Sequence, residues 1–131
     1  MCKGSDNMKK GFTLIEMLAV IALLGIIGAI SYPIVTREIN KSKEKSYQTQ
    51  INYIKGAAKR WAVKNNELLT TDNTNITVDL KTLKKEGFLE NTDIIDPRTN
   101  KIITGCVEII YNVEYNQHTY NYKTSCTETN Y

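Results

Sequence analysis

The sequence has few of the residues that build catalytic and metal sites. One histidine and three cysteines occur in 131 residues, which is little material for a Cys/His catalytic pair or a cluster of metal ligands. The lone His118 lies in a predicted turn, and no Ser/His/Asp arrangement, metal-ligand spacing or phosphate-binding loop is recognisable. We therefore expect no catalytic residues, no metal, no cofactor and no enzymatic activity.

Charge and chain length exclude further classes. A formal net charge of +3 is too small to indicate a nucleic-acid-binding protein. The length is enough for one hydrophobic core but short for two. With 41% hydrophobic and 24% charged residues, the average composition is that of a small soluble domain, but that average conceals a very uneven distribution.

One long apolar segment dominates the N-terminal third. Residues 12–36 contain 18 apolar residues among 25, and their only charge is Glu16; residues 17–36 carry no charge. As a helix with a rise of about 1.5 Å per residue, such a segment spans the roughly 30 Å hydrocarbon core of a bilayer. We predict a single-pass membrane helix.

A secretory signal peptide is the competing interpretation, because Lys9 and Lys10 precede the apolar run. The run is long for that role, and Arg37 and Glu38 follow it directly, without a small-residue cleavage site. The lysine pair places the N-terminus in the cytoplasm by the positive-inside rule, so that the rest of the chain lies outside.

Glu16 is unusual because a carboxylate within a membrane helix costs roughly 2.5–3.5 kcal/mol on insertion scales. It needs a partner or a function, unless it reaches the headgroups as an interfacial residue. The sequence KKGFTLIE, residues 9–16, resembles the class III signal of the type IV pilin and pseudopilin family. That signal is a short basic leader ending in Gly, followed by Phe and a hydrophobic helix with Glu four residues beyond the Phe.

The resemblance implies cleavage by a prepilin peptidase between Gly11 and Phe12, N-methylation of Phe12 and retention of the helix. It also implies that Glu16 pairs with the new amine of a neighbouring subunit and so sets the assembly register, because a misplaced subunit leaves a buried charge unpaired. Pro33 stands where these subunits commonly have a proline and is expected to kink or locally melt the helix.

The leader, residues 1–11, has two possible starts, because Met8 is itself a candidate initiator. Cys2 lies in the segment that cleavage removes, and we assign it no role.

Residues 37–66 are predicted to continue the helix. One apolar stripe recurs at spacings of 4, 3, 4 and 3, formed by Tyr47, Ile51, Ile54, Ala58 and Trp61. Between Arg37 and Lys64, eight basic residues oppose two acidic ones. Three interpretations of this positive charge remain open. The basic residues form a solvated face near anionic headgroups, pack against acidic neighbours, or contact DNA.

Residues 67–131 are predicted to form a small globular head that depends on this helix for its core. We expect a loop at 66–77, a helix capped by Asp79 with Leu80 and Leu83 on one face and Gly87 as its stop, and a turn at 96–100. Strands are expected at 101–104, 106–115 and 119–123, with Val113 and Tyr115 on the apolar face of the second, and a turn at 116–118.

Cys106 and Cys126 are candidates for a disulfide, because the head is expected outside the membrane. The expected hairpin register places these cysteines on opposite faces. A bulge at Gly105 or an irregular tail around Cys126 resolves that conflict, and two free thiols are the alternative.

The sequence thus predicts an α+β fold divided into a leader (1–11), an assembly helix (12–36), its amphipathic continuation (37–66) and a head (67–131). The resemblance implies a filament subunit that is anchored in the cytoplasmic membrane and reaches the cell surface after assembly. Implied partners are other pilin subunits, the prepilin peptidase, a membrane platform protein and an assembly ATPase, while DNA is possible but not indicated. A pseudopilin of a type II secretion or competence DNA-uptake system, or a membrane-tethered binding module, are the alternatives.

Overall fold

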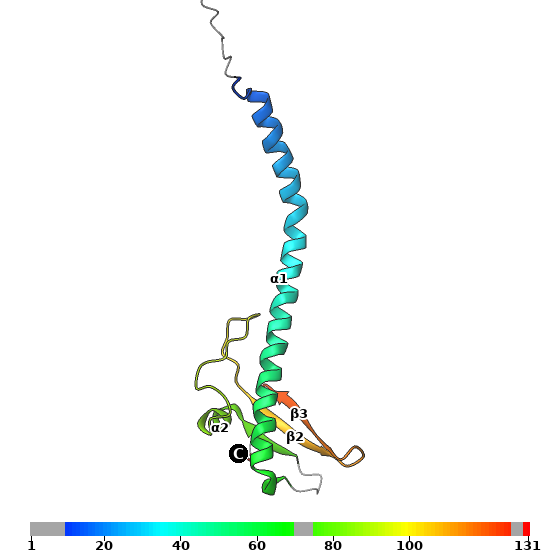
Figure 1. The fold of residues 1–131 in the computed structure, drawn as a ribbon, viewed down its shortest axis with the longest axis vertical. Helices are drawn as coiled ribbons and strands as arrows, with labels where there is room; N and C mark the ends of the chain where they lie inside the picture. Colours follow the sequence, from blue (N-terminus) through cyan, green and yellow to red (C-terminus); the bar gives the residue numbers. More distant parts are fainter. Residues whose placement is uncertain (1–9, 70–74, 127–129) are drawn as a thin grey trace, which may run out of the picture. The chain divides into compact units, whose positions relative to one another are not determined.

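The computed structural model describes residues 10–69, 75–126 and 130–131. Residues 1–9 of the predicted leader, with Cys2, Met8 and Lys9, residues 70–74 of the predicted loop and residues 127–129 lie outside this description. The chain forms two compact units, Met1–Ile39 and Asn40–Tyr131, and the fold is α+β as predicted. Figure 1 shows the elements, which are α1 (Leu14–Lys64), the 3-10 helix η1 (Asn66–Leu68), β1 (Ile76–Asp79), α2 (Leu80–Lys85), β2 (Cys106–Asn112) and β3 (Gln117–Lys123).

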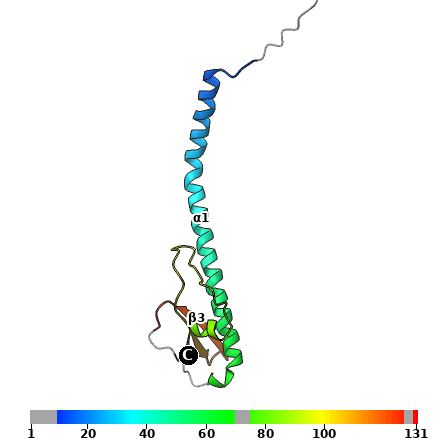
Figure 2. The same ribbon diagram turned by 90° about the vertical axis from the view of Figure 1, so that its left-hand side faces the viewer.

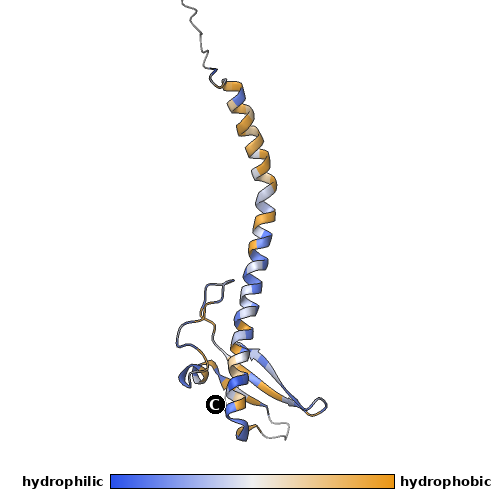
Figure 3. Ribbon diagram, in the orientation of Figure 1, coloured by the Kyte–Doolittle hydropathy of each residue, from blue (hydrophilic) through white to orange (hydrophobic). Residues whose placement is uncertain are grey.

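The first unit consists of the N-terminal part of α1 and the residues before it. Its helix begins at Leu14, two residues after the predicted start at Phe12, and continues through Pro33. Local melting at Pro33 was therefore a wrong expectation. All side chains from residue 10 to residue 46 are exposed, and Figure 3 shows that hydrophobic residues dominate the beginning of α1. Among the described residues, α1 alone is long and apolar enough to cross a membrane.

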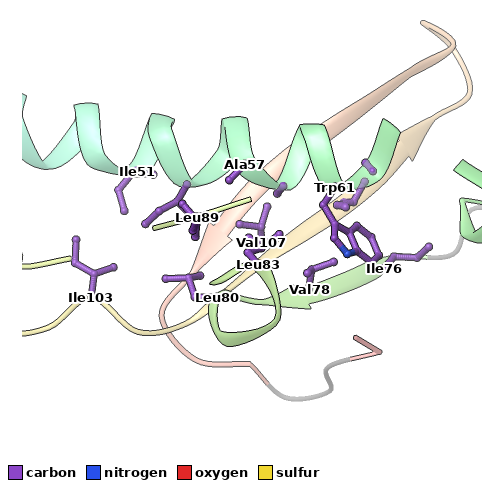
Figure 4. Packing of buried hydrophobic residues seen from close by; sticks show 14 residues of the cluster. Ile51, Ala57, Trp61, Ile76, Val78, Leu80, Leu83, Leu89, Ile103 and Val107 are labelled. Carbon is purple, nitrogen blue, oxygen red and sulfur yellow. The ribbon is translucent and has the colours of Figure 1, made fainter. Parts of the chain in front are cut away.

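In the second unit, the predicted apolar stripe of α1 is the centre of the core. Ile51, Ile54, Ala58 and Trp61 are buried, and Tyr47 packs at the margin. Figure 2 shows the sheet and α2 on one side of this part of α1. Figure 4 shows the side chains that meet the stripe, namely Ile76, Val78, Leu80, Leu83, Leu89, Ile103 and Val107.

The sheet has three antiparallel strands in the order β1-β2-β3. In its register, Val107 of β2 lies opposite Val78 of β1 and Tyr122 of β3. Tyr120 and Tyr122 are partly buried, and this burial raises the pKa of both phenols. Val78, Val107, Tyr120 and Tyr122 lie on one face of the pleated sheet. This face packs against α1.

The predicted extent of the hairpin strands was wrong. β2 ends at Asn112, and Val113 and Tyr115 lie in the turn with 62% and 67% of their surface exposed. The Asn112 side-chain oxygen accepts hydrogen bonds from the Glu114 and Tyr115 N–H groups, which closes an Asx-type turn. Of the predicted turn at 116–118, Asn116 lies in the turn, whereas Gln117 and His118 begin β3. The four-residue turn preserves the predicted alignment of Tyr120 and Tyr122 with the apolar face of β2.

Two further expectations around the sheet were wrong. Residues 101–104 form no strand and contribute only an isolated bridge between Ile102 and Ile95. Residues 76 and 77, predicted as the end of a loop, belong to β1, which continues to Asp79. The predicted α2 was correct, since the Asp79 carboxylate accepts from the Lys81 N–H and both Leu80 and Leu83 are buried.

The predicted turn at 96–100 is attached to α1 by Arg98. Its guanidinium donates to Asp96 at 3.1 and 3.0 Å and to Glu44 of α1 at 3.1 Å. It also lies 3.3 Å from the centroid of the Tyr47 ring, a cation–π geometry. One side chain therefore holds residues 94–103, which we call the proximal hairpin, against α1.

These contacts change the acidity of the groups involved. The hydrogen bonds from Arg98 hold the pKa of Asp96 below its ordinary value. The Gln48 amide, and next Arg98, lower the pKa of Glu44. The Arg98 pKa is raised, mainly by its bond to Asp96.

We predict that Arg98→Met flattens the acid dependence of stability. A carboxyl whose folded-state pKa is lowered contributes stability that is complete above its ordinary pKa of about 4 and is lost as the pH falls through the lower folded-state pKa. The full chain in detergent, unfolded with urea and followed by fluorescence of the single Trp61, measures this slope. Arg60→Met is the control, because Arg60 donates to the Phe88 carbonyl and should retain the wild-type slope. Equal slopes in all three proteins contradict the prediction.

We also predict that Gly105→Ala destabilises the second unit by at least about 2 kcal/mol. Gly105 has φ +140°, and a Cβ there would lie 2.2 Å from the Lys123 carbonyl oxygen. The same urea titration measures the loss. Gly56→Ala is the control, because its Cβ meets only Arg60 at 3.7 Å and alanine favours a helix by about 1 kcal/mol. A Gly105→Ala protein as stable as wild type contradicts the prediction.

Candidate processing and assembly site

Gly11 and Phe12 lie before α1, in a segment without regular secondary structure. Both are exposed, Phe12 with 82% of its surface. A Cβ at Gly11 would meet nothing within 4 Å, so the packing of this chain makes no demand for glycine there. The peptide bond between the two residues is therefore open to an external partner, and a glycine at this position favours close approach of another backbone.

Glu16 lies in the first turn of α1 and forms a reciprocal cap with Thr13. The Thr13 N–H donates to Glu16 Oε2 at 2.9 Å, and the Glu16 N–H donates to Thr13 Oγ1 at 3.3 Å. This is a capping box, which satisfies two backbone N–H groups at the start of a helix. It explains why α1 begins at Leu14.

Thr13 is the residue of this site that the sequence reasoning did not single out. The signal was present, because Thr-x-x-Glu before an apolar run is the pattern of a capping box. The box fixes the Glu16 carboxylate at the end of the helix, beside the backbone of the junction. A carboxylate has further acceptor positions, so this cap is compatible with a second, external partner for Glu16.

Pro33 is not part of this junction. It lies 17 residues beyond Glu16 in α1, which corresponds to roughly 25 Å of helix. The structure thus brings together Gly11, Phe12, Thr13 and Glu16 and leaves Pro33 apart.

Cys106 and Cys126 are joined by a disulfide, with an S–S distance of 2.04 Å and a Cα–Cα distance of 6.1 Å. Cys106 begins β2 and is fully buried, and Cys126 lies three residues beyond the end of β3. Of the two arrangements that resolve the register conflict, the structure has the irregular tail. The bond ties that tail to the sheet.

The basic residues of α1 are mostly uncovered by the second unit. Of the eight between Arg37 and Lys64, only Lys55 is half-buried. Arg60 donates to the Phe88 carbonyl at 3.1 Å and Lys64 lies over the Phe88 ring. Most of the positive charge of this part of α1 is therefore exposed on the surface of the isolated chain.

Within residues 10–69, 75–126 and 130–131, no group of three or more His, Cys, Asp or Glu side chains is placed to hold a metal ion. The titratable groups of the second unit that show altered acidity take part in the packing of the proximal hairpin and of the sheet.

Comparisons with known proteins bear on the same residues. The family described as the prokaryotic N-terminal methylation motif matches residues 6–32, which include the junction and most of the apolar helix. The chain is similar to competence protein ComGC of Halalkalibacterium halodurans, with 23% identity over 107 residues that cover 82% of this chain and 97% of that protein. No solved structure matches the chain. A methylation motif at the start of an exposed apolar helix, followed by a small α+β unit, is consistent with the type IV pilin-like family.

Proposed function

We propose that this chain is made as a prepilin and becomes a structural subunit, not an enzyme, of a type IV pilus-like filament. The observation that carries the proposal is the exposed apolar part of α1, which begins directly after the Lys-Gly-Phe junction and contains one carboxylate. The similarity to a competence protein favours a competence DNA-uptake system over a type II secretion system as the machine that the filament serves.

In this proposal, a prepilin peptidase cleaves the bond between Gly11 and Phe12 and the new Phe12 amine is N-methylated. The accessible junction and the lack of any packing role for Gly11 support this step. Until assembly, α1 anchors the subunit in the cytoplasmic membrane with its N-terminus in the cytoplasm. A membrane platform protein and an assembly ATPase then add the subunit to the filament, which reaches the cell surface.

The apolar part of α1 has two successive environments that hide it from water. Together with Phe12 before the helix, its large apolar side chains up to Val35 are between 41% and 82% exposed in the isolated chain. Stable soluble monomers rarely expose so large an apolar surface. Lipid covers these side chains first, and helices of other subunits cover them in the filament.

Glu16 sets the register of that bundle. The capping box holds its carboxylate close to Phe12, where cleavage creates a cationic amine. In the apolar filament core, this carboxylate pairs with the amine of a neighbouring subunit, and a subunit at the wrong height leaves a charge buried without a partner.

We predict that wild-type protein from cells with the peptidase has the mass of residues 12–131 plus one methyl group, whichever methionine starts translation. Gly11→Ala should retain its leader, because a side chain before the cleaved bond opposes the close approach of this backbone to the peptidase. Intact-protein mass spectrometry distinguishes the two. Gly25→Ala is the control, since its Cβ meets nothing within 4 Å, and should be processed. Equal masses for wild type and Gly11→Ala contradict the processing step.

We predict that Glu16→Gln and Glu16→Ala both lower the amount of subunit in sheared filaments by at least about tenfold, because an unpaired buried charge costs roughly 3–5 kcal/mol. Glutamine loses the charge but retains an oxygen that accepts from the Thr13 N–H. A defect of Glu16→Gln is therefore due to the lost charge and not to a lost helix cap. Glu90→Gln, at an exposed position of the second unit, should assemble normally. Normal assembly of Glu16→Gln would contradict charge pairing, and a membrane-tethered binding module would retain its activity in all three variants.

A further inference from the structure

The proximal hairpin presents two isoleucines to solvent. Ile95 and Ile102 are bridge partners, and the hairpin is closed by hydrogen bonds from the Ile103 N–H to the Ile94 oxygen at 2.7 Å and from the Asp96 N–H to the Lys101 oxygen at 2.8 Å. Ile103 is buried in the core, whereas Ile95 and Ile102 are 50% and 52% exposed. The two exposed side chains share the outer face of the hairpin, because bridge partners of an antiparallel pair point to the same side.

This hairpin lies at the end of the second unit that contains the first α1 residues of that unit, from Asn40 onward. Arg98 at the hairpin tip contacts Glu44 and Tyr47, which are among the first residues of α1 in this unit. Figure 1 shows the hairpin, in olive, beside that stretch of α1. The Arg98 contacts hold the isoleucines in a fixed position, which reduces the entropy cost of docking.

The opposite end of the second unit is also apolar. It carries Val63 and Leu68, 72% and 38% exposed, where α1 ends and η1 follows. The β2–β3 turn adds Val113 and Tyr115 at 62% and 67%, and Figure 1 shows this turn at the same end of the unit as the end of α1, to one side of the helix. We call these four residues the distal patch.

The charged residues of the two ends are complementary. Around the proximal hairpin, Lys43, Lys45 and Lys101 are exposed, while the charges of Glu44, Asp96 and Arg98 are engaged with one another. Beside the distal patch, Glu67 and Glu114 are exposed, and the exposed Lys64 lies over the Phe88 ring. A basic end and an acidic end attract when they face each other across an interface.

We propose that the proximal hairpin of one copy of this chain docks on the distal patch of a second copy. The two surfaces differ, so the contact is head-to-tail and leaves a free surface at each end of every dimer. Such heterologous contacts do not close on themselves unless they form a ring, and otherwise they propagate as an open helical assembly. This proposal rests on the proposed filament and adds to it a contact between second units that is separate from Glu16.

Cysteine cross-linking tests the contact in assembled filaments. The double variant Ile102→Cys/Tyr115→Cys is produced in cells with the assembly machinery, and sheared filaments are treated with a short bis-maleimide. Cys106 and Cys126 are bonded to each other, so the introduced thiols are the reactive pair of the mature chain. Because each copy contributes one cysteine to each of two contacts, we expect a ladder of dimers, trimers and longer covalent chains on denaturing gels.

The single variants and a displaced pair are the controls. Ile102→Cys and Tyr115→Cys produced together should give dimers only, and each alone should give monomers. Glu86→Cys/Tyr115→Cys places the first thiol at the exposed C-cap of α2 and should give no ladder. Filaments that form normally but yield no ladder from the Ile102/Tyr115 pair overturn this contact and leave the proposed function intact, whereas absence of filaments from wild type counts against the proposed function itself.

A charge exchange tests whether the basic end faces the acidic end of another copy. Lys101→Glu should lower the filament yield by roughly tenfold, since like charges across an interface oppose association. Adding Glu114→Lys to the same chain should restore most of that yield. A defect that is the same with and without Glu114→Lys shows that Lys101 faces another acidic surface, such as lipid headgroups, and overturns the proposed pairing of the two ends.

Discussion

The buried stripe of α1 and the apolar face of the sheet complete one another, and the second unit depends on their contact. Trp61, Ile54 and Ala58 come from the helix, and Val107 and Ile109 from the central strand. A three-stranded sheet of this size buries little by itself, and a lone helix is marginal in water. Since the same helix continues into the apolar segment, the residues that fold the second unit and those that anchor the chain belong to a single covalent element.

This continuity explains why α1 changes character along its length. Up to Val35 its large apolar side chains are exposed, whereas from Ile51 onward one face is buried. The first pattern suits a surrounding of lipid or other helices, because every face is apolar. The second suits a single packing partner. Between them lie basic residues that neither pattern buries, such as Lys43 and Lys45. The mean hydropathy of the whole chain describes neither part.

Features with strong local signals were predictable from sequence. The stripe around Trp61, the Asp79 cap and the turn after Asp96 each depend on residues within one turn or one helix. The length of β2 was not predictable, because apolar alternation continues through Val113 while the Asn112 side chain ends the strand. The attachment of Arg98 to Glu44 joins positions 54 residues apart, and the sequence carries no periodic signal for such a pair.

The disulfide and the chain end together protect one edge of the sheet. Beyond Cys126, the Asn130 N–H donates to the Thr77 oxygen and the Asp79 N–H donates to the Tyr131 oxygen, at 3.1 and 3.0 Å. The Tyr131 ring packs against Trp61 at 5.6 Å between centroids. Exposed edge strands pair indiscriminately when copies of a protein crowd together, as they would in the proposed filament. These hydrogen bonds occupy backbone groups of β1 and so limit strand pairing at that edge, whereas β3 forms the other edge of the sheet.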